Sequence, residues 1–274
     1  MTSLVVTADD FGAAVEVNEA VELAHRRGIL TAASLMVAAP AAADAIERAR
    51  RLPRLGVGLH LVLVDGRPLL PAGQVPDLVD QNGLFLTNMA LVGLRIALSA
   101  EVRRQVRAEV LAQFASFAAT GLRFDHVNAH KHFHVHPSIA GMVLEAAARH
   151  GVRALRAPVT SGRPQGSGWF AAPFARSLFR RARRRGMVTP DRVFGLAETG
   201  HMTAERIRAT VAVLGGGLNE LYLHPATRDD FAGHGPGYCH RAELEGLLDP
   251  ASTAALSAHN VRLGSFASFQ GAVA

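Results

Sequence analysis

A dense cluster of histidines is the strongest chemical signal in this sequence. Residues 128–137 read NAHKHFHVHP and carry histidines at the alternate positions 130, 132, 134 and 136. With His126, five of the 13 histidines lie within eleven residues. Alternate residues of a strand share one face, where neighbouring imidazoles are costly to desolvate and repel one another when charged. The cluster therefore predicts a metal-binding or catalytic segment, and a solvated loop is the alternative.

Four more side chains of similar chemistry follow short apolar runs elsewhere in the chain. They are Asp9, Asp10, His60 and His224. Taken singly, the aspartates could cap a helix, and each histidine could be structural. In α/β folds, however, the carboxyl ends of parallel strands meet at one rim, where sites form. Because separate segments supply these residues and the cluster, we expect them to converge on one site.

Eight strand–helix alternations are predicted to position this site. Strands are predicted at 3–8, 32–38, 56–61, 123–128, 154–158, 192–196, 219–225 and 262–269. Helices are predicted up to 27 and at 40–53, 100–121, 137–150, within 168–186, at 203–214 and before the last strand. A long loop is predicted after the third strand, at 64–88, where Gly, Pro, Asp and Asn are frequent.

Such alternation predicts an α/β fold with a parallel sheet. We expect a single domain over residues 1–274, folded as a TIM-like (β/α) barrel that can be irregular. An open doubly wound sheet is the alternative. No G-x-G-x-x-G pattern follows the first strand, so dinucleotide binding is disfavoured.

Composition narrows the classes of protein. The 274 residues are 49% hydrophobic and 19% charged, which suits a globular domain with a sizeable core. Cys239 is the only cysteine, so an intramolecular disulfide is excluded and a reducing compartment fits. The first residues lack the basic region of a signal peptide, and no uncharged apolar run reaches the roughly 18 residues of a transmembrane helix. We expect a cytoplasmic protein.

The net charge of +6 would permit binding to nucleic acid or to an anionic membrane. Only 6% of the residues are aromatic, which disfavours a nucleic-acid binder, and we expect no nucleic-acid partner. Residues 168–186 place aromatic side chains beside arginines. They predict either an ordinary surface helix or a peripheral contact with anionic lipid at the inner membrane face. The sequence leaves a homodimer open.

Several motifs together resemble the YdjC/chitooligosaccharide deacetylase family of metal-dependent carbohydrate deacetylases. They are VTADDFG at 6–12, GLHLVL at 58–63, NAHKHFHVHP at 128–137 and LYLHPA at 221–226. The likeness extends through ILTAASLMV at 29–37 and RLGSF at 262–266, so it covers nearly the whole chain. The histidine stretch and the loop VDGRPLLP at 64–71 are most similar to the branch associated with hopanoid biosynthesis (HpnK-type).

The resemblance implies a role for each candidate residue. Asp9 corresponds to the general base and Asp10 to a metal ligand, with His60 and His130 completing the metal site. His224 corresponds to a general acid or oxyanion partner. Substrate contacts are expected from His132, His134, Arg156 and Tyr238.

This sequence also departs from the family pattern. Asn128 and Ala129 replace Asp-Ser, Lys131 replaces a histidine, and His136 is an additional histidine, whereas the ligand position His130 is kept. The residues that support the ligands and the contacts to the sugar are therefore expected to differ.

The function implied is removal of acetate from an N-acetylglucosamine group on a hopanoid glycolipid, with one divalent ion, Zn or Mg. One carboxylate and two imidazoles leave open positions for water and the acetyl oxygen. The alternative is another metallohydrolase, such as a phosphoesterase, which would require further ligands for a second metal.

Overall fold

The computed structural model describes residues 1–160 and 168–270, and it describes the side chains from Ala171 onward in the second range. Within these residues a seven-stranded parallel sheet forms the centre of the molecule, in the order β4-β3-β2-β1-β6-β5, with β7 also paired to β1. The strands are β1 (Thr2–Phe11), β2 (Ala32–Leu35), β3 (Gly56–Leu61), β4 (Val127–Ala129), β5 (Arg192–Phe194), β6 (Gly217–Leu223) and β7 (Arg262–Leu263). Both faces of β1, β2 and β3 are buried, as expected for parallel strands covered by helices.

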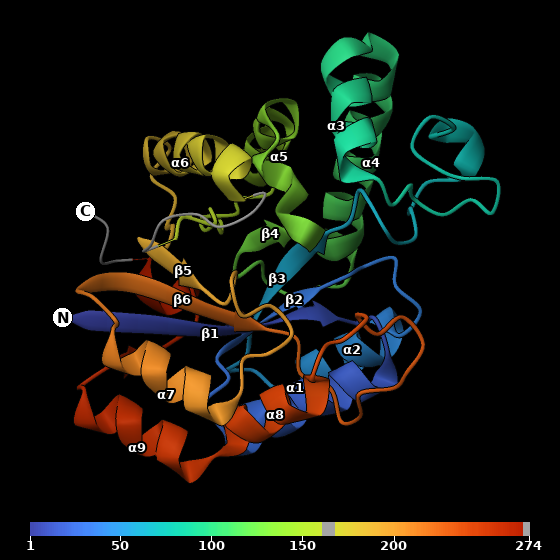
Figure 1. The fold of residues 1–274 in the computed structure, drawn as a ribbon. Helices are drawn as coiled ribbons and strands as arrows, with labels where there is room; N and C mark the ends of the chain where they lie inside the picture. The colour runs from blue at the N-terminus through green and yellow to red at the C-terminus, as the bar shows by residue number, and fades with distance from the viewer. Residues whose placement is uncertain (161–167, 271–274) are drawn as a thin grey trace.

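The helices lie in two groups around this sheet (Figure 1). In that view the upper group is α3 (Met89–Leu98), α4 (Ala100–Ala119), α5 (Pro137–Arg149) and α6 (Gly168–Arg183). The lower group is α1 (Val15–Arg27), α2 (Ala42–Arg50), α7 (Ala204–Ala212), α8 (His240–Leu248) and α9 (Pro250–Ala258). Three short 3-10 helices are η1 (Ala72–Gln74), η2 (His130–Val135) and η3 (Ala267–Phe269). None of the described helices is both long and apolar enough to cross a membrane.

An irregular segment, residues 154–159, connects the two edges of the curled sheet. The backbone N–H of Arg156 donates to the carbonyl of Val127 in β4 at 3.0 Å. On the other side, the N–H of Val193 in β5 donates to the carbonyl of Val159 at 2.8 Å. The sheet therefore curls into a half-barrel whose gap is bridged by this segment. The predicted TIM-like α/β fold, in its irregular form, is confirmed.

Several predicted elements differ in detail. Residues 154–158 form two isolated bridges, Leu155 with Val127 and Ala154 with Val188, instead of a strand. Pro158 has no N–H with which to extend the pairing. The predicted strand at 262–269 shortens to β7 followed by η3. The last predicted helix is two helices, α8 and α9, and Pro250 begins the second.

The histidine cluster is not a strand, so the prediction that its histidines share one strand face is wrong. β4 ends at Ala129, and the chain turns directly into η2. Lys131 (φ 51°) and His132 (φ 54°) adopt the left-handed conformation, which aims successive side chains in different directions. The histidines of this segment therefore point into different environments instead of sharing one face.

Helix α3 was not predicted from the sequence. Its residues, MALVGLRIAL, are apolar nearly all round and lack a clear helical period. Its ends are nevertheless well defined, since the side chain of Asn88 caps it and Ser99 caps the following α4. The pair α3–α4 rises beside the open end of the sheet (Figure 1).

Candidate active site

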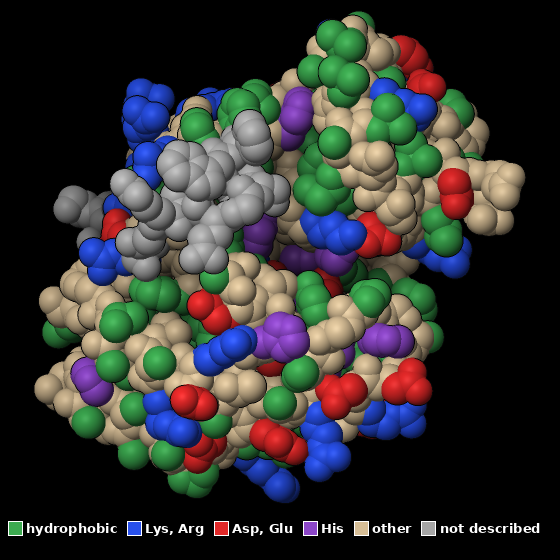
Figure 2. Space-filling model, in the orientation of Figure 1, with side chains coloured by type: hydrophobic (Ala, Val, Ile, Leu, Met, Phe, Trp, Pro, Cys, Tyr) green, Lys and Arg blue, Asp and Glu red, His purple; other side chains and the backbone are tan. Residues whose placement is uncertain are grey.

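A deep cavity of about 2070 Å³ lies at the carboxyl ends of the strands. Its floor carries the predicted catalytic and metal-binding side chains together with one predicted substrate contact, His132. They come from β1, β3, η2 and the residue that follows β6. They are Asp9, Asp10, His60, His130, His132 and His224. Figure 2 shows histidine side chains in this hollow, beneath the α3–α4 end of the molecule. The predicted convergence at one rim is therefore present.

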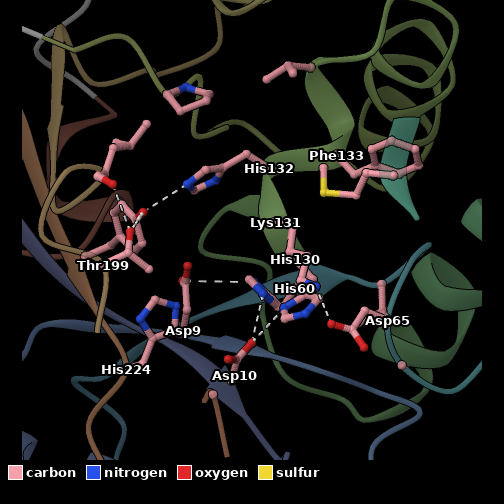
Figure 3. A pocket seen from close by; sticks show the side chains of 18 of the residues that line it. Asp9, Asp10, His60, Asp65, His130, Lys131, His132, Phe133, Thr199 and His224 are labelled. Atoms are coloured by element: carbon pink, nitrogen blue, oxygen red, sulfur yellow. Dashed lines mark hydrogen bonds and ion pairs between the residues drawn. The ribbon is translucent and has the colours of Figure 1, made fainter. Parts of the chain in front are cut away.

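Three of these side chains form a compact candidate metal site. Asp10, His60 and His130 each offer one ligand atom, and these atoms all lie within 4.8 Å of one another. Asp10 Oδ1 is 3.2 Å from His60 Nε2 and 3.2 Å from His130 Nδ1 (Figure 3). Asp10 has a positive φ of 60°, an uncommon conformation for a residue other than glycine.

The hydrogen bonds of Asn128 show that this donor set fits a cation. The amide nitrogen of Asn128 donates to Asp9 Oδ1 at 3.0 Å, so its oxygen Oδ1 faces His60 Nδ1 at 2.7 Å. That oxygen accepts the Nδ1 proton of His60, which leaves the lone pair of Nε2 directed at Asp10. Two acceptor atoms then face each other at 3.2 Å. A divalent ion coordinated by both would satisfy this arrangement.

Asn128 also belongs to a chain of buried hydrogen bonds through the barrel. Its amide donates to Ser34 Oγ at 2.8 Å, and that hydroxyl lies 3.0 Å from His126 Nε2. His126 Nδ1 is 3.0 Å from the carboxylate of Asp125, which accepts two backbone N–H groups at the chain's C-terminal end. This polar network thus orients both Asp9 and the candidate ligand His60.

Asp9 lies beside the candidate metal site and is held by a buried arginine. Arg156 donates to both oxygens of Asp9, at 2.5 and 3.0 Å, and to Glu220 Oε1 at 2.7 and 2.9 Å. Burial alone would raise the pKa of Asp9, but the charge and the hydrogen bonds of Arg156 outweigh it and lower that pKa well below its usual range. Asp9 is therefore an ionised carboxylate in a fixed orientation.

His224 follows β6, and Glu243 of α8 fixes its backbone. The Glu243 carboxylate accepts the N–H of His224 at 2.5 Å and that of Met202 at 2.8 Å. Burial raises the pKa of Glu243 to about 7. Burial also lowers the pKa of His224, whose ring lies 5.2 Å from the ring of Tyr238.

The four residues expected to contact substrate divide into two pairs. His132 and Tyr238 line the cavity. His132 Nε2 is 3.1 Å from the hydroxyl of Tyr222, and its Nδ1 has no partner among the described residues. The prediction for His134 and Arg156 does not hold, because both are fully buried and neither lines the cavity. His134 Nε2 instead lies 2.7 Å from the carbonyl oxygen of Arg156.

The other polar residues of the histidine segment lie at the rim. Lys131 forms an ion pair with Asp65 of the loop after β3 (Figure 3). His136 is half-buried and lines the cavity next to Gly93 of α3. Neither belongs to the group of three candidate ligands.

Sequence reasoning missed the supporting residues Glu220, Tyr222 and Glu243. Glu220 and Tyr222 alternate with His224 along β6, and both contact Arg156. A polar residue at every second position from Glu220 onward was the available signal. Glu243 lies on a helix distant in sequence and offered no comparable signal.

Comparisons with known proteins show what this chain is similar to. A carbohydrate deacetylase of Geobacillus stearothermophilus is 34% identical over 269 residues, covering 97% of each chain. A carbohydrate deacetylase of Mus musculus is 37% identical over 251 residues, covering 86% of this chain and 78% of the mouse protein. The crystal structure of an Enterococcus faecalis protein described as a cellobiose-phosphate cleavage protein superposes with a TM-score of 0.79, at 26% identity over 98% of both chains.

The fold and the site define a single α/β-barrel protein with a candidate metal centre at the carboxyl ends of its strands. The chain belongs to the YdjC-like protein family, whose sequence profile matches residues 3–258.

Proposed function

We propose that this protein is a metal-dependent carbohydrate N-deacetylase that removes acetate from an N-acetylglucosamine group. The observation that carries the proposal is the cluster of Asp10, His60 and His130 beside the fixed carboxylate of Asp9. The names of the similar bacterial and mammalian proteins support the same reaction.

The chain's own residues suit the steps of amide hydrolysis. A divalent ion held by the three ligands would polarise the acetyl carbonyl and lower the pKa of a water. Asp9 is outside the ligand cluster. Asn128 and Arg156 occupy both lone pairs of its Oδ1 and one lone pair of its Oδ2, so the remaining lone pair of Oδ2 can accept a proton from the attacking water. His224, on the β6 side, is suited to protonate the departing amine or to stabilise the developing oxyanion.

A single candidate metal site supports this function over a phosphoesterase. Among the described residues only one group of three potential ligands lies close enough to hold an ion. A dinuclear phosphoesterase would require further ligands for a second ion about 3.5–4 Å from the first. Zinc and magnesium are the proposed ions, and mixed nitrogen and oxygen ligands are softer than magnesium prefers.

We propose a hopanoid glycolipid as the substrate, on the basis of the motif resemblance. The test is mass spectrometry of N-acetylglucosaminyl hopanoid, and separately of diacetylchitobiose, after incubation with the purified protein and metal. Loss of one acetyl group from the hopanoid supports the whole proposal. Loss from diacetylchitobiose alone would keep the deacetylase and reject the lipid, and loss from neither would reject both.

We also propose a cytoplasmic location with weak binding to anionic membranes through α6. Arg180, Arg184 and Arg185 are exposed, whereas Arg183 pairs with Asp191 and so contributes to the fold. The aromatic side chains of Trp169 and Phe170, which contributed to the prediction, lie outside the described residues.

The membrane proposal is tested by sedimentation with phosphatidylglycerol vesicles at low and high salt. Each arginine near the surface contributes about 1 kcal/mol, so replacing the three exposed arginines by glutamine should abolish sedimentation. Native protein that stays in the supernatant at low salt would reject the membrane contact.

A further inference from the structure

A buried chain of hydrogen bonds leads away from the candidate metal site to a histidine that has no role so far, His126. Ser34 in β2 and Asn128 in β4 form the connection, and all three side chains are completely buried. His126 does not line the cavity and is not among the three candidate ligands. Polar side chains are costly to bury, so a chain of them in the core requires a reason other than packing.

The far end of the chain fixes the position of the proton on His126. The carboxylate of Asp125 lies 3.0 Å from His126 Nδ1. It also accepts the backbone N–H groups of Phe266 and Ala267, at 3.2 and 2.9 Å. A carboxylate surrounded by donors acts as an acceptor, so Nδ1 of His126 carries a proton directed at Asp125.

This proton sets the direction of the next two hydrogen bonds. Nε2 of His126 lies 3.0 Å from Ser34 Oγ and, among the described residues, is the only acceptor for the hydroxyl proton of Ser34. The Ser34 oxygen is then left to accept a hydrogen bond from Asn128, at 2.8 Å. The nitrogen of the Asn128 amide must therefore face Ser34, and its oxygen must face His60.

The direction of this amide decides whether His60 can bind an ion. As described above, the Asn128 oxygen accepts the Nδ1 proton of His60, which leaves the lone pair of Nε2 for the ion. An amide turned by half a rotation would present its nitrogen, a donor, to Nδ1. His60 would then carry its proton on Nε2, toward Asp10, and would have no lone pair there for a cation.

The strand that supplies His60 also leaves room for the ring of His126. A Cβ atom at Gly58 of β3 would lie 2.5 Å from that ring, so no side chain fits at this position. The ring also stacks on Phe266, with the ring centroids 4.3 Å apart. The imidazole of His126 is therefore held in place beside the strand that carries the ligand.

We propose that His126 is a positioning residue for the metal centre, because through Ser34 it fixes the direction of the Asn128 amide. His126 touches neither the ion nor the substrate, and it acts only through this chain of hydrogen bonds. The inference rests on the metal-dependent function proposed above. It also accounts for the amide at position 128, since an aspartate could accept from His60 but could not donate to Ser34 and Asp9.

The first test is the nitrogen NMR spectrum of the zinc-loaded protein with isotope-labelled histidine, in which protonated and unprotonated ring nitrogens are distinguished. The signals of His126 are assigned by their loss in the His126→Gln variant. We expect His126 to be protonated on Nδ1 alone. A proton on its Nε2 would overturn the inference, because Ser34 could then not donate to His126.

The second test is the affinity for zinc, measured by competition with a chelator. Ser34→Ala removes the acceptor that holds the Asn128 amide, and zinc binding should weaken about tenfold to a hundredfold, the usual effect of losing a residue that orients a metal ligand. The matched control is Ser252→Ala, which removes an equally buried hydroxyl that donates to the carbonyl of Gly246 at 3.0 Å. The control should bind zinc as the native protein does.

A pair of substitutions at position 126 separates positioning from a general effect on folding. The side-chain carbonyl of His126→Gln can reach the place of Nε2 and accept from Ser34, whereas the shorter side chain of His126→Asn cannot. Thermal unfolding compares the stability of the two variants. We expect His126→Gln to retain the greater part of the zinc affinity and His126→Asn to weaken it about as much as Ser34→Ala does.

These measurements need no substrate, so they separate the inference from the proposed reaction. If Ser34→Ala weakens zinc binding while the native protein releases no acetate from diacetylchitobiose, the positioning role stands and the deacetylase proposal fails. Zinc affinity that is the same in Ser34→Ala and native protein, or that falls equally in Ser252→Ala, would overturn the positioning role.

Discussion

Replacing Arg156 by methionine should destabilise the folded protein by about 3–5 kcal/mol, the usual cost of removing one partner from a buried ion pair. Arg156 is completely buried and donates four hydrogen bonds of 2.5–3.0 Å to Asp9 and Glu220. Both carboxylates are themselves buried, at 2% and 0% exposure. Methionine would fill similar space and leave two buried carboxylates without a cation.

The pH dependence of this loss has a definite sign. In the native protein the pKa of Asp9 is lowered, so its contribution to stability is present above its unfolded pKa and is lost only in strong acid. In the Arg156→Met variant the unpaired carboxylate of Asp9 should have a raised pKa, because burial is no longer opposed by the arginine. The free-energy penalty of that buried charge then vanishes in acid and grows as the pH rises through the raised pKa. The stability gap between variant and native protein should be wider at pH 8 than at pH 5.

Thermal unfolding followed by circular dichroism measures the gap. At roughly 2 °C per kcal/mol for a chain of this size, the expected decrease in Tm is about 6–10 °C. The control is the double variant Arg156→Met/Glu220→Gln, which removes one unpaired carboxylate and should recover part of the loss. A decrease below about 2 °C, or a gap that narrows as the pH rises, would refute the reasoning.

Three further predictions concern the site. Asp9→Asn should retain metal, measured by plasma spectrometry, while turnover falls at least about a hundredfold, the lower range for a general base; near-normal turnover would place the base elsewhere. His136→Leu should leave metal content nearly intact, because His136 is not among the clustered ligands, and a large loss would show a rebuilt site. The pKa of Glu243 is raised to about 7 by burial, so native stability should decline as the pH rises from about 5 to 8. Glu243→Gln should reduce that decline in thermal unfolding, and an identical pH profile would contradict the assignment.

The sequence was most informative where local pattern and tertiary environment agree. The run at 56–61 predicted a strand and forms β3 with those bounds, because an apolar run with β-branched and leucine side chains fits a buried parallel strand. The predicted meeting of Asp10, His60 and His130 at one rim depended only on the rule that sites form at the carboxyl ends of strands. That rule can be applied even when the order of the strands in the sheet is known only approximately.

The features that the sequence did not predict depend on packing between residues far apart in the chain. β4 ends at Ala129 because the following residues turn into η2, and nothing local distinguishes NAHKHFHV from an alternating strand. Arg156 resembled a substrate-binding residue, yet its partner Asp9 lies 147 positions away in the chain. Its burial follows from strand neighbours that only the folded sheet defines.

The central claim is that Asp10, His60 and His130 bind one divalent ion that the deacetylation requires. The most direct test is to measure metal content and acetate release together for native protein and the His60→Ala variant, after dialysis against the same metal. We predict about one ion per native chain, and loss of both the ion and acetate release in the variant. Unchanged metal content in His60→Ala, or two ions per native chain, would contradict the claim.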